Sequence, residues 1–159
     1  MPVQKNQLVI TRIFNAPRNL VWKAWTDPVH FRRWWGPKRF TCPAANTDFR
    51  VGGRYLWCMR SPEGKDYWST GIFREIVPME RIVYTDSFAD EKGNIVPASY
   101  YGLLGHGMSL EFQVTIILED LGSTTKMTLT HAGFPEGEVT VLASAGWNES
   151  FDKLAASLK

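Results

Sequence analysis

Residues 21–37, VWKAWTDPVHFRRWWGP, contain four of the seven tryptophans of this 159-residue chain, together with two helix-boundary signals. The pair Asp27-Pro28 is typical of a helix start, because the Asp oxygen can cap an unpaired amide and Pro lacks the N–H that would be unpaired there. Gly36-Pro37 is typical of a helix end. The stretch therefore predicts two short helices, at 17–25 and 28–35. Helices this short are marginal alone, so they must pack against a larger body.

Most of the remaining chain predicts β-strands. The clearest period of two lies at 110–118, where polar residues alternate with Leu110, Phe112, Val114, Ile116 and Leu118. The segment 124–131 follows after the turn at 120–123, so the two segments predict a hairpin with one buried face. Five further strands are expected, at 3–14, 41–51, 54–60, 66–77 and 81–88.

The C-terminal segment from residue 138 changes to the helical period. One side of a helix of about 20 residues carries Val139, Leu142, Ala143, Gly146, Trp147, Phe151, Leu154 and Leu158. Residues 89–108 fit neither period, and their four glycines would suit a moving lid. One strand, two helices, six strands and one long helix predict an α+β fold. The economical arrangement curls an antiparallel sheet around the terminal helix, and the two short helices close one end.

Length and composition are those of one globular domain, covering residues 1–159. No apolar run approaches the ~20 residues of a membrane span, and the N-terminus lacks the layout of a signal peptide. Cys42 and Cys58 have no metal-like spacing and are expected to be free thiols. These features predict a soluble cytoplasmic protein without membrane insertion. Separately, a monomer or a homodimer is expected.

A basic cluster accompanies the central tryptophans and superficially suggests nucleic-acid binding. Its cations are Arg32, Arg33, Lys38 and Arg39. Four cations in a chain of net charge +2 make a weak electrostatic footprint, and Trp34-Trp35 is better explained by packing. We therefore expect no nucleic-acid partner.

Four segments occur in an order and spacing typical of a known family: VWKAWTDPVHFRRWWGP (21–37), DFRVGGRYLW (48–57), GIFREIVPMERIVYTDSF (71–88) and HAGFPEG…AGWNESFDKLAASL (131–158). The chain resembles the activator of heat-shock protein 90 ATPase homologue family, a branch of the START-like (SRPBCC, birch-pollen-allergen-like) superfamily, from residue 10 to residue 158. The resemblance implies the helix-grip fold. In that fold a curved antiparallel sheet wraps around a long C-terminal helix, with a cavity between them.

The resemblance implies less about function. Members of the superfamily bind lipids, sterols, polyketides and other hydrophobic molecules, and some branches catalyse cyclisation or hydrolysis. The chaperone-activating role belongs to larger eukaryotic relatives with an additional N-terminal domain, for which this chain has no room. Co-chaperone activity is therefore not expected here.

Residues on the predicted inner faces are candidates to line the implied cavity. They are Tyr55, Trp57, Met59, Phe73, Glu75, Tyr84, Phe112, Val114, His131, Gly146 and Trp147. Gly146 beside Trp147 removes volume from the inner face of the long helix, at a cost in helix stability of about 1 kcal/mol against Ala. The alternative is that the same residues form a solid core.

The polar candidates each have two interpretations. His131 ends the last strand and is either a hydrogen-bonded strand end or a polar anchor at the cavity mouth. Glu75 forms either a cross-strand pair with Arg81 or an acid–base group, if it is buried and unpaired. His30 is interpreted as surface decoration, and His106 lies in the glycine-rich connection. No catalytic motif surrounds any histidine, so no catalytic residue, metal or cofactor is assigned.

The leading hypothesis is a non-enzymatic protein that binds a small hydrophobic or amphipathic ligand between sheet and helix. On this hypothesis, removing Trp57 should weaken binding more than folding. A second hypothesis is a cyclase or hydrolase that uses a cavity His or Glu. A third is an interaction protein that meets a chaperone or another subunit through the Trp/Arg surface of the helix pair.

Overall fold

The computed structural model describes residues 7–102, 110–133 and 138–158. Within these residues the strands are β1 (Gln7–Phe14), β2 (Thr41–Thr47), β3 (Arg54–Arg60), β4 (Asp66–Val77), β5 (Arg81–Ala89), β6 (Phe112–Asp120) and β7 (Thr125–Ala132). The helices are α1 (Arg18–Thr26), α2 (Pro28–Phe31) and α3 (Glu138–Ser157), with a short 3-10 helix, η1, at Ala98–Tyr101.

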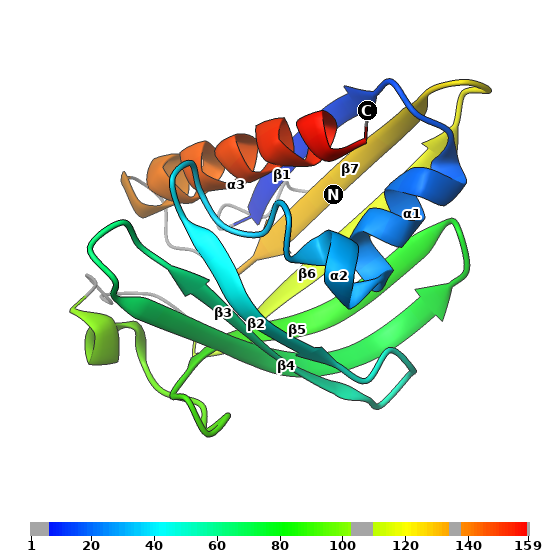
Figure 1. Ribbon diagram of the computed structural model, residues 1–159. Helices are drawn as coiled ribbons and strands as arrows, with labels where there is room; N and C mark the ends of the chain where they lie inside the picture. Colours follow the sequence, from blue (N-terminus) through cyan, green and yellow to red (C-terminus); the bar gives the residue numbers. More distant parts are fainter. Residues whose placement is uncertain (1–6, 103–109, 134–137, 159) are drawn as a thin grey trace.

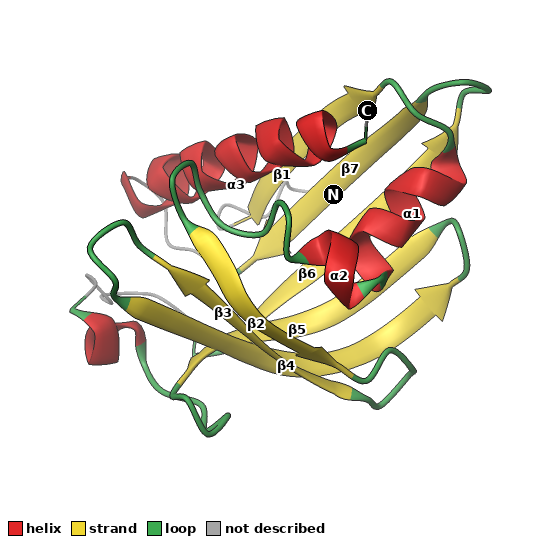
Figure 2. Cartoon of the chain, in the orientation of Figure 1, coloured by secondary structure: helices red, strands yellow, loops and turns green. Residues whose placement is uncertain are grey.

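The strands form one antiparallel sheet in the order β1-β7-β6-β5-β4-β3-β2, so β2 to β7 make a meander and β1 joins it beside β7. The sheet is strongly curved, and α3 runs across its concave side (Figure 1). Helices α1 and α2 lie on the same side, towards one end, so the three α-helices share one face of the sheet (Figure 2). The predicted α+β helix-grip fold is confirmed.

The boundary between the short helices follows the predicted chemistry. The Asp27 side chain accepts a hydrogen bond from Val29 N at 3.0 Å, and Pro28 occupies the first helical position. However, α2 ends at Phe31 instead of residue 35. Trp34 is fully buried and donates its indole N–H to the Ala24 carbonyl of α1 at 2.9 Å. This tertiary contact accompanies the change from helix to turn after Phe31.

Some strands are shorter than the sequence predicts, because residues at their predicted ends fold into turns instead. Strand β2 stops at Thr47, since the next residues fold into a turn closed by Asp48 N donating to Arg54 O at 3.0 Å. Strand β6 begins at Phe112, and Leu110 is exposed. Residues 3–6 of the predicted first strand lie outside the described residues.

The connection after β5 is held in place over its described part. Lys65 Nζ donates to the Tyr101 carbonyl of η1 at 3.0 Å, and Trp68 N donates to the Tyr101 hydroxyl at 3.0 Å. That hydroxyl also donates to Ala89 O. The segment up to Gly102 is therefore anchored to β4 and β5 and does not provide the slack expected of a lid; His106 lies outside the described residues.

The core lies between the concave face and the three helices. Its fully buried side chains include Phe14, Ile116, Met127, Leu129, Phe151 and Leu154. The Trp25 indole N–H points at Met127 Sδ, 3.3 Å away, and so ties α1 to β7. His30, predicted as surface decoration, is partly buried and lies 3.0 Å from Ser157 Oγ at the end of α3.

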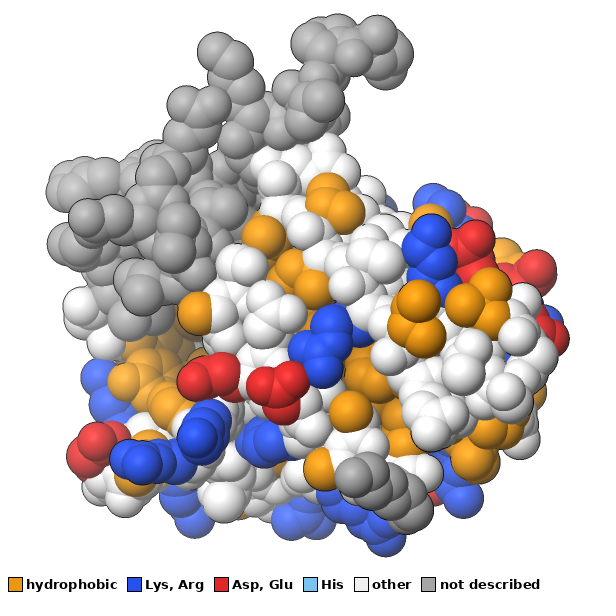
Figure 3. Space-filling model, turned by 90° about the horizontal axis from the view of Figure 1, so that it is seen from above, with side chains coloured by type: hydrophobic (Ala, Val, Ile, Leu, Met, Phe, Trp, Pro, Cys, Tyr) orange, Lys and Arg blue, Asp and Glu red, His pale blue; other side chains and the backbone are white. Residues whose placement is uncertain are grey.

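The exterior carries charges of both signs. Seen from the side of α3, Lys, Arg, Asp and Glu side chains are interspersed over the visible part of the surface (Figure 3). This distribution agrees with the net charge of +2. No described helix combines the length and apolar character that crossing a membrane requires.

Candidate functional site

An aromatic wall covers the concave face of β3, β4 and β5. Tyr55 and Trp57 of β3 stack with ring centroids 3.7 Å apart. The Tyr84 ring of β5 lies 5.5 Å from Tyr55 and 5.6 Å from Trp57, and Phe73 of β4 lies 5.8 Å from Tyr55. All four are buried. The structure thus brings four of the predicted lining residues into one continuous surface.

Trp35 joins this wall to α3. Its ring centroid lies 4.9 Å from Trp57 and 5.5 Å from Trp147. Trp147 also stacks on Phe151, at 5.4 Å. Aromatic rings therefore span the distance between sheet and helix in this structure. Trp35 was not among the predicted lining residues, because two consecutive tryptophans do not reveal which one faces the sheet.

A polar network runs through the apolar interior beside this wall. The Tyr55 hydroxyl lies 2.7 Å from Asp86 Oδ1 and 2.9 Å from Thr85 O. Asp86 Oδ2 lies 3.8 Å from His131 Nε2. The Trp147 indole N–H donates to His131 Nδ1 at 3.0 Å, so a neutral His131 carries its proton on Nε2, facing Asp86. The network links β3, β5, β7 and α3.

Burial sets the protonation of this network. It raises the pKa of Asp86 from 3.8 to about 6, against a smaller lowering by the Tyr55 hydrogen bond. It lowers the pKa of His131 from 6.5 to about 3. At neutral pH His131 is therefore uncharged and Asp86 is mostly ionised. The groups can orient and hydrogen-bond a guest or hold a proton, but the described network contains no Ser or Cys nucleophile.

Asp86 was missed as a candidate, although the sequence holds a signal for it. It lies within the apolar strand β5, in the same alternation as Tyr84 and Phe88. A strand of period two therefore places its carboxyl on the same face as those rings. A single acidic residue on the apolar face of a predicted strand therefore indicates a buried carboxyl group.

Gly71 of β4 allows Tyr55 to reach β5. Gly71 pairs with Tyr55 across the β3–β4 ladder. A Cβ on Gly71 would overlap Thr85 O and lie 2.8 Å from Tyr55 Cε2. The missing side chain thus permits the close approach of the Tyr55 ring and the Thr85 carbonyl.

Gly71→Ala is expected to lower the free energy of unfolding by about 2 kcal/mol or more, because neither backbone nor ring can easily move aside. Urea denaturation measures this change. The control is Gly146→Ala, whose Cβ would lie 3.7 Å from Pro37 Cγ, an ordinary contact, within α3. That change should be neutral or stabilising by up to about 1 kcal/mol. Equal stability of the Gly71→Ala variant and the wild type would contradict this account of Gly71.

The other predicted lining residues fall into two groups. Phe112 and Val114 are buried on β6, and the Phe112 ring lies 5.2 Å from His131. Met59 and Gly146 are partly buried. Gly146 faces Pro37, and a Cβ at this position would lie 3.7 Å from Pro37 Cγ, so the segment after α2 does not require a glycine here.

Glu75 does not join the predicted lining residues that face the interior. Its carboxylate lies 3.1 Å from Arg81 Nε, and 48% of its side chain is exposed. The register shifts between Phe73 and Glu75, which indicates a β-bulge, and a bulge changes which residues of a strand face outwards. The geometry matches the cross-strand pair with Arg81.

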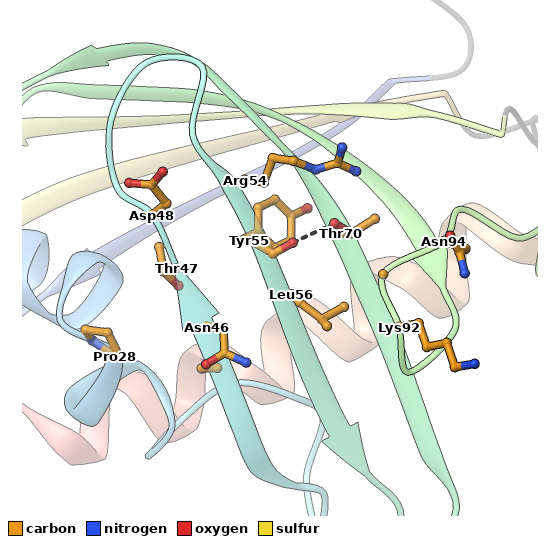
Figure 4. A pocket seen from close by; sticks show the side chains of 12 residues that line it. Pro28, Asn46, Thr47, Asp48, Arg54, Tyr55, Leu56, Thr70, Lys92 and Asn94 are labelled. Carbon is orange, nitrogen blue, oxygen red and sulfur yellow. Dashed lines mark hydrogen bonds between the residues drawn. The ribbon is translucent and has the colours of Figure 1, made fainter.

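A groove of about 790 Å³ lies along β2, β3 and β4 on the convex side of the sheet and reaches Pro28 of α2 at the edge strand β2 (Figure 4). It is lined by Pro28, Ala45, Asn46, Thr47, Asp48, Arg54, Tyr55, Leu56, Thr70, Lys92, Gly93 and Asn94. Of the predicted lining residues, Tyr55 alone contributes to it. Leu56 and Thr70 alternate with the inward-facing residues of β3 and β4, so this part of the groove faces away from the aromatic wall, whereas Thr47 meets that wall through the indole N–H of Trp57. Among the described residues, no group of His, Cys, Asp and Glu could hold a metal ion.

Comparisons with known proteins agree with the resemblance drawn from the sequence. The family described as "Activator of Hsp90 ATPase homolog 1-like protein" matches residues 15–159. A crystal structure of a protein from Chromobacterium violaceum has 28% identity, covers 98% of this chain and 98% of its own, and has a TM-score of 0.80. A solution structure of a protein from Arthrobacter aurescens has 28% identity, with 99% and 88% coverage and a TM-score of 0.75. The AHSA1 protein from Silicibacter pomeroyi has the same fold, with 24% identity, 96% coverage of both chains and a TM-score of 0.77. No curated protein matches.

Proposed function

Because this chain belongs to the Activator of Hsp90 ATPase homolog 1-like family, we propose that it binds a small hydrophobic or amphipathic ligand between the sheet and α3. The observation that carries the proposal is the buried polar network of Tyr55, Asp86, His131 and Trp147. A protein that needed only a stable core would avoid burying these groups, since each loses its hydration.

The surroundings of the network suit an amphipathic guest. The aromatic wall offers large apolar surfaces for affinity, and the network offers a few polar groups that would fix orientation. Trp35 and Trp147 are only partly buried, unlike the fully buried Trp34. We expect these two rings to move aside when a ligand enters, because they make the contacts that bridge sheet and helix.

A panel of lipids, aromatic compounds and polyketide-like compounds is expected to contain a member that raises the melting temperature. At a free concentration of about 100 times its Kd, a ligand adds about 2.7 kcal/mol, or roughly 5–10 °C for a chain of this length. Differential scanning fluorimetry measures the shift. A complete panel without any shift would remove the support for this function.

The variant for mapping the site is Trp57→Phe, with ligand affinity as the readout. Trp57 is 2% exposed, stacks on Tyr55 and donates its indole N–H to Thr47 Oγ1 at 2.9 Å. Truncating it to Ala would therefore cost folding stability as well as binding, contrary to the simple expectation from the sequence. A cytoplasmic location and a monomeric or homodimeric state stay predictions.

A further inference from the structure

Tyr84 carries a hydroxyl group that the fold buries without pairing it. The residue is 1% exposed, and its hydroxyl oxygen makes no hydrogen bond to any described residue. Burying an unpaired hydroxyl costs roughly 1–3 kcal/mol, which Phe at the same place would avoid. The hydroxyl therefore needs a partner that the described chain does not supply.

The rings of Tyr55, Trp57 and Phe73 surround Tyr84, with centroids 5.5, 5.6 and 6.0 Å away. The nearby Asp86 carboxylate adds to burial in raising the pKa of Tyr84, so the phenol stays protonated. Tyr84 can therefore donate one hydrogen bond and accept others at neutral pH. It lies where the apolar wall meets the polar network.

The charges near this hydroxyl are unfavourable for an ionised guest. Two partly buried cations on the helix side of the sheet are engaged elsewhere: Arg12 pairs with Asp152 at 2.9 Å, and Lys153 donates to Pro37 O and Phe40 O at 3.1 and 3.0 Å. A carboxylate guest would meet the negative charge of Asp86, on whose pKa no described Lys or Arg acts.

A cationic guest is also disfavoured. Asp86 Oδ1 already accepts from the Tyr55 hydroxyl, and Asp86 Oδ2 faces the ring nitrogen of His131. An ammonium group would have to give up its water for a buried carboxylate that already accepts a hydrogen bond from Tyr55 and whose other oxygen lies 3.8 Å from His131 Nε2.

We infer that the polar end of the ligand is an uncharged hydrogen-bonding group, a hydroxyl or a carbonyl, bound at the Tyr84 hydroxyl. This inference rests on the proposed function and specifies its ligand class. Neutral alcohols, phenols and ketones belong to that class, and fatty acids and amines do not.

The test uses one apolar chain with four different ends. Isothermal titration calorimetry at neutral pH compares 1-decanol, 2-decanone, decanoate and decylammonium, and diphenylhexatriene serves as a fluorescent hydrocarbon without any polar group. The alcohol and the ketone are expected to bind at least about 10-fold more tightly than either ion. Tyr84→Phe should weaken 1-decanol binding about 10-fold, the loss of one hydrogen bond, and leave diphenylhexatriene binding unchanged. Tyr100→Phe, at a tyrosine that is 59% exposed, is the matched control.

The outcomes separate this inference from the proposed function. Binding of decanoate or decylammonium as tight as that of 1-decanol overturns the inference while ligand binding stands. The same holds if Tyr84→Phe affects diphenylhexatriene and 1-decanol equally or affects neither. If none of the five compounds binds and the wider panel gives no thermal shift, the proposed function itself fails. The wild-type ranking needs no variant, so a folding defect in Tyr84→Phe does not weaken the test.

Discussion

Trp34→Ala is expected to lower the free energy of unfolding by about 3–5 kcal/mol, the largest effect of any single truncation considered for this protein. Trp34 is fully buried, and its ring lies 4.7 Å from Trp25, 5.2 Å from Phe31 and 6.2 Å from Phe151. The change removes these contacts and leaves the Ala24 carbonyl, the acceptor of the indole N–H, without that bond.

Urea denaturation followed by circular dichroism measures the loss, which corresponds to roughly 6–20 °C in melting temperature. Val29→Ala is the control, because Val29 lies in the neighbouring helix with 69% of its surface exposed and should change stability by less than about 0.5 kcal/mol. A loss below about 1 kcal/mol in Trp34→Ala would show that the packing of Trp34 does not hold α1 and α2 on the core.

Asp86→Asn and His131→Gln are expected to change the pH dependence of stability in opposite directions. Burial raises the pKa of Asp86 from 3.8 to about 6, so its contribution to stability is fully present below about pH 3.8 and is lost as the pH rises through about 6. Burial lowers the pKa of His131 from 6.5 to about 3, so its contribution is present above about pH 6.5 and is lost as the pH falls towards 3. In the wild type the two slopes oppose each other between about pH 4 and 6.

In each single variant, the pH dependence of stability should follow the titratable group that remains. Relative to the wild type, Asp86→Asn should gain stability as the pH rises from about 4 to 6, by on the order of 3 kcal/mol, because the penalty of ionising a buried Asp is gone. His131→Gln should gain stability as the pH falls over the same interval, by a similar amount. Gln offers an oxygen that can still accept from Trp147 Nε1, so the loss of packing is limited.

Urea unfolding at several pH values from about 4 to about 7 gives these differences, with the double variant as the control, in which both slopes are absent. Curves for the two single variants that run parallel to the wild-type curve would show that neither group titrates abnormally in the native state. That result would also contradict the burial of Asp86 and His131 as the cause of their shifted pKa values.

Local sequence patterns determined the elements of this fold. The alternation at Phe112, Val114 and Ile116 specifies which side chains face inwards, and the Asp27-Pro28 pair specifies where α2 begins. Both are properties of the backbone over a few residues, so no knowledge of distant segments is needed. The order of the elements then left one economical way to cover the C-terminal helix.

The candidate site was decided by contacts between distant segments. The sequence does not say that Tyr55 crosses Gly71 to reach Asp86, nor that a bulge after Phe73 turns Glu75 outwards. It also does not say which of Trp34 and Trp35 enters the core. These facts depend on strand register and on the curvature of the whole sheet, which bring polar side chains from four elements within about 4 Å of one another. The chain by itself therefore determined the secondary structure and the architecture, whereas burial of the network, and with it the protonation of Asp86 and His131, exists only once the sheet has closed around α3.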